Sequence, residues 1–175
     1  MILTYHSILD NVHSGGIYIS PFEEDMLNPN SCDYRIDYKL LELSDIPVDP
    51  KKPSTYTEID FTDEGYVLSP NKTYLANTFE EIGSDYFVPI LVGKSSLGRL
   101  GLFLQITADL GNLGAKHKWT LELKAVQPIK IYPMMRIGQV SFWDVEGEKT
   151  LYKGKYDRFS VAKSSEIYKE FSVME

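Results

Sequence analysis

The sequence predicts an all-β protein with one domain, and three observations favour this class. Aromatic residues make up 13% of the 175 residues, and β-branched residues are also abundant. Glycine and proline recur throughout, whereas long segments with helical periodicity are scarce. Many short strands joined by turns are typical of a closed barrel or a jelly roll. A chain of this length can bury a single core, so no second domain is needed.

The N-terminal part of the chain contains one helical pattern and two strand patterns. Residues 1–13 include TYHSILDNV, which favours a short helix, and GGIYIS directly after it favours a strand. In the segment DYRIDYKLLEL, residues 33–43, apolar residues alternate with charged ones, so Ile36 and Tyr38 lie on the same apolar face of the expected strand. Strict alternation of this kind predicts one continuous strand.

The middle of the chain begins with a break in this pattern. Residues 44–60, SDIPVDPKKPSTYTEID, are rich in proline and charge, which predicts an exposed loop. The segments GYVLSP and KTYLANTFEEI, which come next, both favour strands.

The stretch LVGKSSLGRLGLFLQITA, residues 91–108, contains Gly-Lys-Ser-Ser, which looks like the end of a phosphate-binding P-loop. A P-loop also needs a glycine five residues before its Gly-Lys pair, and Val88 occupies that position. The residues after the motif alternate instead of showing helical periodicity. The basic and hydroxyl residues are therefore expected in a loop between two strands that does not run into a helix.

The strongest strand patterns are KWTLELKAV and PIKIYPMMRIGQVSFWDV. In the first, Trp119 and Leu121 share one face, and Thr120 and Glu122 share the other, so a core behind and a cleft in front are compatible. The last segment, LYKGKYDRFSVAKSSEIYKEF, is polar and basic. It predicts either a tail that orders over a ligand or a solvated terminus.

Composition excludes several classes of protein. The net charge of −7 argues against a nucleic-acid-binding surface, because such surfaces neutralise phosphates. The lone Cys32 excludes an intramolecular disulfide framework, and with only three scattered histidines it also argues against a protein-bound zinc. No signal peptide or long apolar run is present, which predicts a cytoplasmic protein that does not enter a membrane.

The run GKSSLGRLGL, followed by TA, LE and PIKIYPMMRIGQVSF, resembles the dCTP deaminases of the trimeric dUTPase-like superfamily. Their pattern, G-R-S-S-x-x-R, T-A-x-R-I-D-P-G, L-E and Y-P-G-M-x-I-x-Q, aligns without a gap from Gly93 to Gln139. The resemblance implies a distorted jelly-roll or dUTPase-like β-barrel over residues 1–151 and a segment, residues 152–175, that closes over the nucleotide. It also implies a homotrimer with active sites between subunits.

The reaction that this resemblance implies is zinc-independent hydrolysis of dCTP, or of a close cytosine deoxynucleotide, to dUTP and ammonia, with magnesium carried by the triphosphate. Glu122 aligns with the family's proton-transferring glutamate, and Ser95 and Arg99 resemble the residues that hold the water and keep that glutamate charged. Without the resemblance, Glu122 would be a residue of a solvated strand face. The nucleotide contacts implied by the resemblance are Lys94, Ser96, the backbone of Ile106 and Ala108, Asn112, Thr120, Gln139, Tyr152 and Lys155.

Several positions depart from the family pattern. Asn112 stands where the pattern has its sugar-loop aspartate, Leu110 where it has arginine, and His117 where a loop glycine is usual. For Gln139, a bond to the barrel wall is as compatible with the sequence as a nucleotide contact. Such a divergent, short chain would suit a viral or phage genome.

Three functions therefore remain open: a dCTP deaminase, a dUTP diphosphatase or bifunctional deaminase and diphosphatase, and an inactive nucleotide-binding regulator. A diphosphatase needs a carboxylate that orients water beside the sugar, where an amide now stands. Asn112 therefore predicts release of dUTP without loss of diphosphate.

Overall fold

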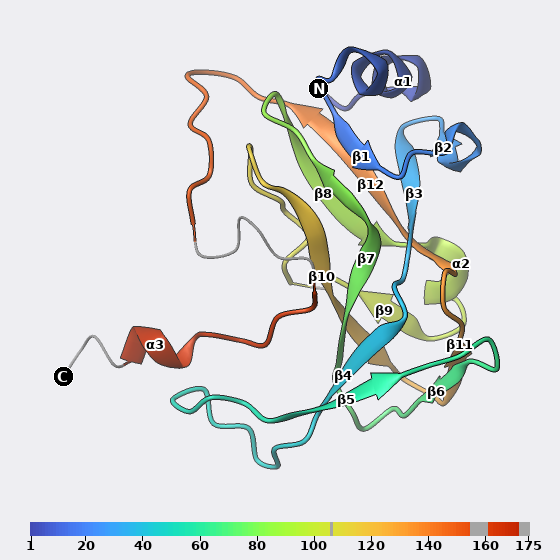
Figure 1. Ribbon diagram of the computed structural model, residues 1–175, viewed down its shortest axis with the longest axis vertical. Coiled ribbons are helices and arrows are strands. Elements are labelled where there is room, and N and C mark those ends of the chain that lie inside the picture. The colour runs from blue at the N-terminus through green and yellow to red at the C-terminus, as the bar shows by residue number, and fades with distance from the viewer. Residues whose placement is uncertain (106, 155–160, 172–175) are drawn as a thin grey trace.

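The computed structural model describes residues 1–105, 107–154 and 161–171. Short strands dominate these residues, with three short α-helices and one turn of 3-10 helix (Figure 1). The strands are β1 (Tyr18–Ser20), β2 (Leu27–Asn28), β3 (Ser31–Arg35), β4 (Lys39–Leu43), β5 (Tyr56–Asp60), β6 (Tyr66–Leu68), β7 (Tyr74–Gly83), β8 (Phe87–Gly93), β9 (Leu102–Leu104), β10 (Lys116–Ala125), β11 (Ile129–Ile131) and β12 (Arg136–Asp144). The helices are α1 (Tyr5–Ser14), the 3-10 turn η1 (Glu24–Met26), α2 (Ser95–Gly98) and α3 (Tyr168–Phe171).

The strands form two main antiparallel sheets and one small sheet. The larger sheet has the order β5-β4-β7-β10-β9, with β1 also paired to β7. The second sheet has the order β2-β3-β12-β8, and β11 pairs with β6. The core lies between the sheets, with Tyr34, Phe142 and Leu121 among its fully buried side chains. This arrangement confirms the predicted all-β class.

The predicted strand over residues 33–43 is wrong, because the chain changes sheets in its middle. β3 pairs with β12 in one sheet, and β4 pairs with β5 and β7 in the other. Between them, Ile36 makes a single bridge to Thr78 and stays buried, whereas Tyr38 is 47% exposed. Ile36 before the crossing and Leu40 after it are both fully buried, so the pattern fails only at Tyr38, which lies in the crossing itself.

Other segments also differ from their predicted form. Residues 56–60 of the predicted loop form β5, which pairs with β4. The loop after β8 contains one turn of helix, α2, although it still lies between two strands as predicted. The last long strand pattern is divided into β11 and β12, with Met134 between them at a φ of 58°. The N-terminal helix is confirmed as α1 and ends at Gly15, whose φ of 80° suits glycine.

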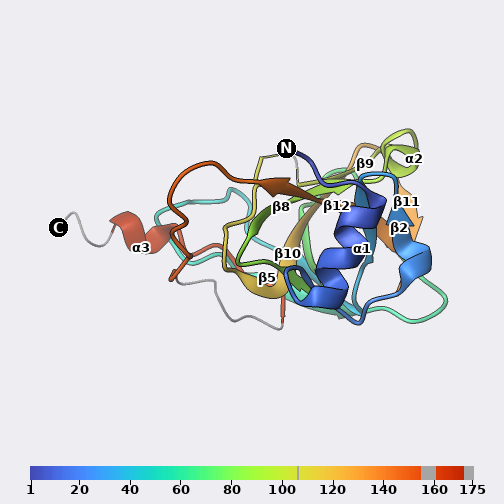
Figure 2. The same ribbon diagram turned by 90° about the horizontal axis from the view of Figure 1, so that it is seen from above.

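The two faces of β10 are as the sequence predicts from Thr120 onward. The register shifts between Lys118 and Thr120, and Trp119, which is predicted on the core face, lines the cavity on the face of Glu122. Leu121 and Leu123 are buried in the core, while Thr120 and Glu122 are half-buried on the opposite face. Figures 1 and 2 both show α2 on one side of β10 and the C-terminal segment with α3 on the other. β10 lies inside its sheet between β7 and β9, and Glu122 pairs with Leu75 of β7 just beyond the end of the ladder with β9.

Candidate active site

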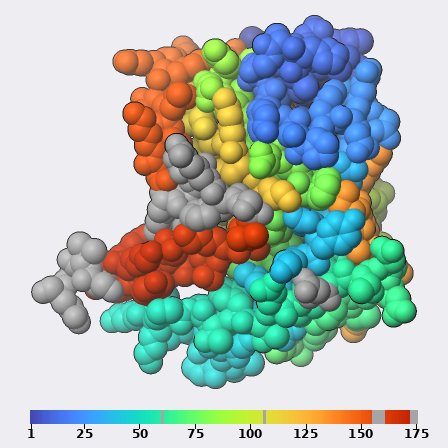
Figure 3. All heavy atoms as spheres, in the orientation of Figure 1, coloured from blue at the N-terminus to red at the C-terminus, as the bar shows by residue number. Residues whose placement is uncertain are grey.

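A cavity of about 520 Å³ lies along the outer face of β10. Its walls come from β10, from the loop between β9 and β10, and from the C-terminal segment, whose residues Lys163–Ser165 border it. Figure 3 shows residues 161–171 (red) lying across this face of the molecule. The predicted site residues that line the cavity are Ala108, Asn112, Thr120, Glu122 and Tyr152.

Glu122 is the only carboxylate among the described residues that line this cavity. Its backbone N–H donates to Oε1 of Gln105 at 2.9 Å, and the backbone N–H of Gln105 donates to the Glu122 carbonyl at 3.3 Å. The hydroxyl of Thr107 lies 3.5 Å from Glu122 Oε2. The carboxylate is therefore carried on a braced backbone and reaches a space large enough for a small organic molecule.

An aromatic wall that the sequence did not predict lines the same cavity as Glu122. The rings of His117 and Trp119 are 4.4 Å apart, and Trp119 Nε1 donates to the Ile82 carbonyl at 2.9 Å. His117 Nδ1 lies 2.8 Å from the Lys118 carbonyl, which can only accept, so Nδ1 carries the hydrogen. The other ring nitrogen of His117 is then the one that can accept a hydrogen bond.

The loop that carries Asn112 packs tightly against this wall. A Cβ atom on Gly111 would come within 2.7 Å of Trp119 Cη2 and 2.6 Å of Pro89 Cγ, so only glycine fits there. Ala115 N–H donates to the Asn112 carbonyl at 3.2 Å, and the Asn112 side chain is exposed at the cavity. The loop thus presents an uncharged amide to the cavity that Glu122 also lines.

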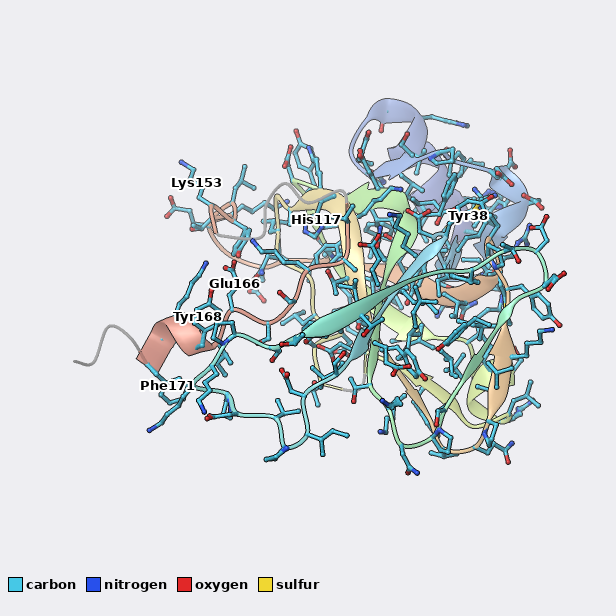
Figure 4. All side chains as sticks on the ribbon, turned by 60° about the horizontal axis from the view of Figure 1, so that its bottom comes forward. Tyr38, His117, Lys153, Glu166, Tyr168 and Phe171 are labelled. Atoms are coloured by element: carbon cyan, nitrogen blue, oxygen red, sulfur yellow. The ribbon has the colours of Figure 1, made fainter. Side chains whose placement is uncertain are left out.

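The C-terminal segment is fixed to the cavity rim by backbone donors. Ala162 N–H donates to Asn77 Oδ1 at 2.9 Å, and Lys163 N–H donates to Thr120 Oγ1 at 3.1 Å. Tyr152 N–H donates to the Leu113 carbonyl at 2.8 Å, which holds the start of the segment at the same cavity. In Figure 4, Glu166, Tyr168 and Phe171 continue along this segment beyond the edge of the sheets.

A second group of predicted residues, Lys94, Ser95, Ser96, Arg99 and Gln139, does not line the cavity. Lys94 forms an ion pair with Asp33, and Gln139 donates to Asp33 Oδ1 at 3.0 Å. Asn28 donates to the same oxygen at 2.8 Å. Gln139 is thus bonded to the wall of the fold.

The charge of Asp33 is stabilised by these neighbours. Burial disfavours the charged carboxylate, but the hydrogen bonds from Lys94, Gln139 and Asn28 outweigh it, so the pKa of Asp33 is lowered. The Asp33 side chain is 5% exposed, and a buried carboxylate with this set of donors remains ionised at neutral pH. Lys94 is accordingly held at the end of β8 in a fixed position.

The remaining polar side chains around α2 are exposed to solvent. Ser95, Ser96 and Arg99 are exposed, and none of them has a side-chain partner among the residues that the structure describes. The helix turn itself is closed by its own backbone, since Arg99 N–H donates to the Ser95 carbonyl at 3.1 Å. These three side chains are therefore available to a group from outside this copy of the chain.

Two predicted contacts, Ile106 and Lys155, lie outside the described residues. Within residues 1–105, 107–154 and 161–171, no group of three or more His, Cys, Asp or Glu side chains could hold a metal ion. None of the helices in those ranges is both long and apolar enough to span a bilayer.

Gln105 and the wall of His117 and Trp119 are the functional candidates that sequence reasoning missed. Gln105 interrupts the apolar run Leu-Phe-Leu-Gln-Ile, and a buried polar residue in a strand pattern is a signal that could have identified it. His117 stands out in the sequence only as a departure from glycine, because the sequence does not show which ring it would contact.

Comparison with known proteins gives the family. The model of the dCTP deaminase-like family matches residues 2–145. Curated relatives called "dCTP deaminase, dUMP-forming" include one from Leptospira biflexa and one from Clostridium beijerinckii, both 41% identical over 172 residues. Each alignment covers 98% of this chain, together with 98% of the Leptospira protein and 99% of the Clostridium protein.

Solved structures support the fold. The crystal structure of a 2'-deoxycytidine 5'-triphosphate deaminase from Agrobacterium tumefaciens superposes with a TM-score of 0.63 at 21% identity. The match covers 81% of this chain and 47% of that one, so this chain spans about half of the length of that protein. At this identity the likeness shows the fold, which is the dUTPase-like all-β fold that the sequence predicts.

Proposed function

The chain belongs to the dCTP deaminase-like family. We therefore propose that it hydrolyses the bond between C4 of the cytosine and the 4-amino group of dCTP, which releases ammonia. The observation that carries this proposal is the position of Glu122, which is the only carboxylate among the described residues lining the cavity. The similarity of relatives over 98% of the chain supports the same reaction.

A single carboxylate can carry out the proton transfers that deamination needs. Glu122 takes a proton from water as the water attacks C4 and gives this proton to N3. It then takes the second proton from the hydroxyl group now on C4 and passes it to the amino group, so that the C4 carbonyl forms as the C4–N bond breaks and ammonia leaves. The Thr107 hydroxyl, 3.5 Å from Glu122 Oε2, can orient the carboxylate. One water is consumed and one ammonia is released, so no other reactant is required.

We further propose that the site is completed by a second copy of the chain in a homotrimer. Ser95 and Arg99, which the family resemblance assigns to the water and to the charge of Glu122, are exposed and do not line the cavity that contains it. A guanidinium cannot lose its proton in a protein, so Arg99 of a neighbouring copy would keep Glu122 ionised. Lys94 and Ser96 would reach the triphosphate from the same turn.

The substrate is proposed to be the magnesium complex of the nucleotide, because magnesium binds readily to phosphate oxygens. Residues 1–151 would form the catalytic barrel and residues 152–175 the segment that closes over the triphosphate. Tyr152 already borders the cavity, and Lys155 is proposed as a phosphate contact. Closure would exclude water and strengthen the charge interactions with phosphate.

A second candidate function adds a phosphate step and ends at dUMP. It is favoured by the names of the relatives, which support dUMP rather than dUTP as their end product. The expectation of dUTP rests on Asn112, whose amide is a very poor base and cannot activate water in place of a carboxylate. Both candidates share the deamination step and differ only in whether diphosphate is then removed.

The test is incubation of the purified protein with dCTP and magnesium, with ammonia, dUTP, dUMP and pyrophosphate measured by chromatography. Ammonia with dUTP supports the simple deaminase, and ammonia with dUMP and pyrophosphate supports the second candidate. In a simple deaminase, Asn112→Asp is expected to raise the ratio of dUMP to dUTP. Absence of ammonia from dCTP would refute both candidates and leave a nucleotide-binding regulator.

A further inference from the structure

The side chain of Gln105 bridges two segments of the candidate site. Its Oε1 accepts the Glu122 backbone N–H at 2.9 Å, and its Nε2 donates to the Ala108 carbonyl at 3.3 Å. The residue is 7% exposed, so neither bond competes with bulk water. Glu122 is the proposed proton carrier, and Ala108 belongs to the segment that resembles the base-reading segment of the family.

The bond to Glu122 replaces a normal rung of the sheet. β9 and β10 pair from Ala125 with Leu102 to Leu123 with Leu104, and this ladder ends there. In an antiparallel pair of strands, every second pair of opposed residues exchanges two backbone hydrogen bonds, with each N–H donating to the carbonyl opposite. Here Gln105 N–H still donates to the Glu122 carbonyl, but the Glu122 N–H is accepted by the Gln105 side chain.

The reason for the replacement is the backbone conformation of Gln105. Its φ is 49°, a left-handed value that non-glycine residues adopt uncommonly. The chain leaves the sheet at this residue, and Ala108 three residues later lines the cavity. Strained conformations of this kind persist only where the surroundings hold them, and they cluster at functional sites. The two side-chain hydrogen bonds of Gln105 stabilise this backbone conformation.

We propose that Gln105 is a positioning residue of the deaminase reaction. Its amide fixes the Glu122 peptide and the segment at Ala108 relative to each other, so that the carboxylate meets the base at hydrogen-bonding distance. General acid–base catalysis needs the carboxylate at about 2.6–3.2 Å from the atom that it serves. A displacement of about 1 Å can cost about 10²-fold in rate. This inference rests on the proposed function.

Two substitutions separate the two bonds. Gln105→Met keeps the length of the side chain and removes both bonds, so we expect kcat for dCTP to fall about 10- to 100-fold. Gln105→Glu keeps an acceptor for the Glu122 N–H but cannot donate to the Ala108 carbonyl. We therefore expect it to raise KM more than it lowers kcat.

Gln127→Met is the matched control. Gln127 Nε2 donates to the Leu100 carbonyl at 3.1 Å, and the residue is exposed and does not line the cavity. We expect its kcat and KM to equal those of the wild type. Unchanged kcat and KM in folded Gln105→Met would overturn the proposal, with folding verified by a cooperative thermal transition.

Hydrogen exchange at the Glu122 amide tests the geometry without any turnover. Loss of the acceptor in Gln105→Met is expected to speed exchange of this amide by about tenfold or more, while Gln105→Glu keeps it protected. If the wild type releases no ammonia from dCTP, the proposed function fails, and the exchange result still decides whether Gln105 holds the Glu122 peptide in place. A Glu122 amide as protected in Gln105→Met as in the wild type would rule that role out.

Discussion

The two groups of candidate site residues differ in how the fold holds them. Around the cavity, Glu122 and Thr120 lie on a central strand, and their neighbours are bonded to other parts of the same chain. Around α2, Ser95 and Arg99 are exposed on a single helical turn and have no side-chain partner in the described residues. The first group lines a cavity, and the second is a set of exposed donors that do not line it. This difference is what the proposed homotrimer requires, in which one copy of the chain supplies the cavity and another copy supplies the donors.

The largest effect is expected at the cavity. Glu122→Gln keeps the size of the side chain but removes the group that accepts and returns protons. We expect the deamination rate to fall by about 10²- to 10⁴-fold or more, with dCTP binding largely kept. The measurement is ammonia release beside a binding titration. Turnover close to that of the wild type would remove Glu122 from the mechanism and leave the cavity without its proposed base.

The comparison also separates what a sequence can predict from what it cannot. The alternation in β10 predicted correctly that Leu121 faces the core and Glu122 the opposite side, because the side chains of a strand point to its two faces in turn. The same rule failed at Tyr38, because the chain changes sheets between β3 and β4 and no local pattern marks that crossing.

The site follows the same division. The resemblance to the family supplied residue types over most of the chain, and five of them line one cavity. It could not supply the brace at Gln105, whose role depends on a φ of 49° and on two contacts across the β9–β10 loop. Nor could it show that Lys94 and Gln139 both bond to Asp33, since these residues come from different strands of the second sheet.

Mixing two inactive variants tests whether the site spans two copies. Arg99→Ala removes an exposed side chain and is expected to abolish activity without loss of stability. If Glu122 and Arg99 act across copies, co-assembly of Glu122→Gln chains with Arg99→Ala chains restores some sites. Random mixing in equal amounts would restore about a quarter of the wild-type activity.

The control for this experiment is the mixture made without denaturation and reassembly, so that the chains do not exchange. Recovered activity only after co-assembly supports the shared site. No recovery in assemblies shown by mass to contain both chains would contradict it, as would a monomeric mass of the active wild type in sedimentation.

A smaller effect is expected beneath α2, where Asp33 anchors Lys94. Asp33→Asn removes the charge that Lys94 pairs with, and we expect the free energy of unfolding to fall by about 1–3 kcal/mol. Asp25→Asn is the control, because Asp25 pairs with Arg136 at 2.6 Å while its side chain is 69% exposed. A pair of that kind is expected to contribute little. Chemical denaturation of the wild type and of both variants measures the free energies of unfolding to be compared.

The pH dependence of this difference comes from the lowered pKa of Asp33. A carboxyl whose pKa is lower in the folded protein stabilises it above the unfolded pKa of about 3.9, and this contribution is lost as pH falls through the folded value. The gap in melting temperature between the wild type and Asp33→Asn should therefore be the same at pH 7 and pH 5 and narrow below about pH 4. A gap that widens in acid would show that Asp33 is not held in its charged form.

The smallest effect is expected where the C-terminal segment meets the cavity. Thr120 Oγ1 accepts the Lys163 N–H at 3.1 Å, and Thr120→Val removes this acceptor while keeping the shape of the side chain. One hydrogen bond contributes about 1 kcal/mol, so exchange of amides in residues 161–165 should rise about fivefold. Thr57→Val is the control, since the Thr57 hydroxyl is hydrogen-bonded to the Ser44 hydroxyl at 3.0 Å, in the β4–β5 hairpin.

If the C-terminal segment closes over the triphosphate, bound nucleotide should counteract the faster amide exchange caused by Thr120→Val. The Glu122→Gln variant is expected to bind dCTP without consuming it, so it is the background for this experiment. Saturating dCTP and magnesium should slow amide exchange in residues 161–165. The slowing should be stronger in the Glu122→Gln, Thr120→Val double variant than in Glu122→Gln alone. The reason is that the added protection is greatest where the unliganded segment opens most often. Equal exchange with and without dCTP would mean that this segment is held by its contacts within the chain, such as those to Asn77 and Thr120, and takes no part in binding.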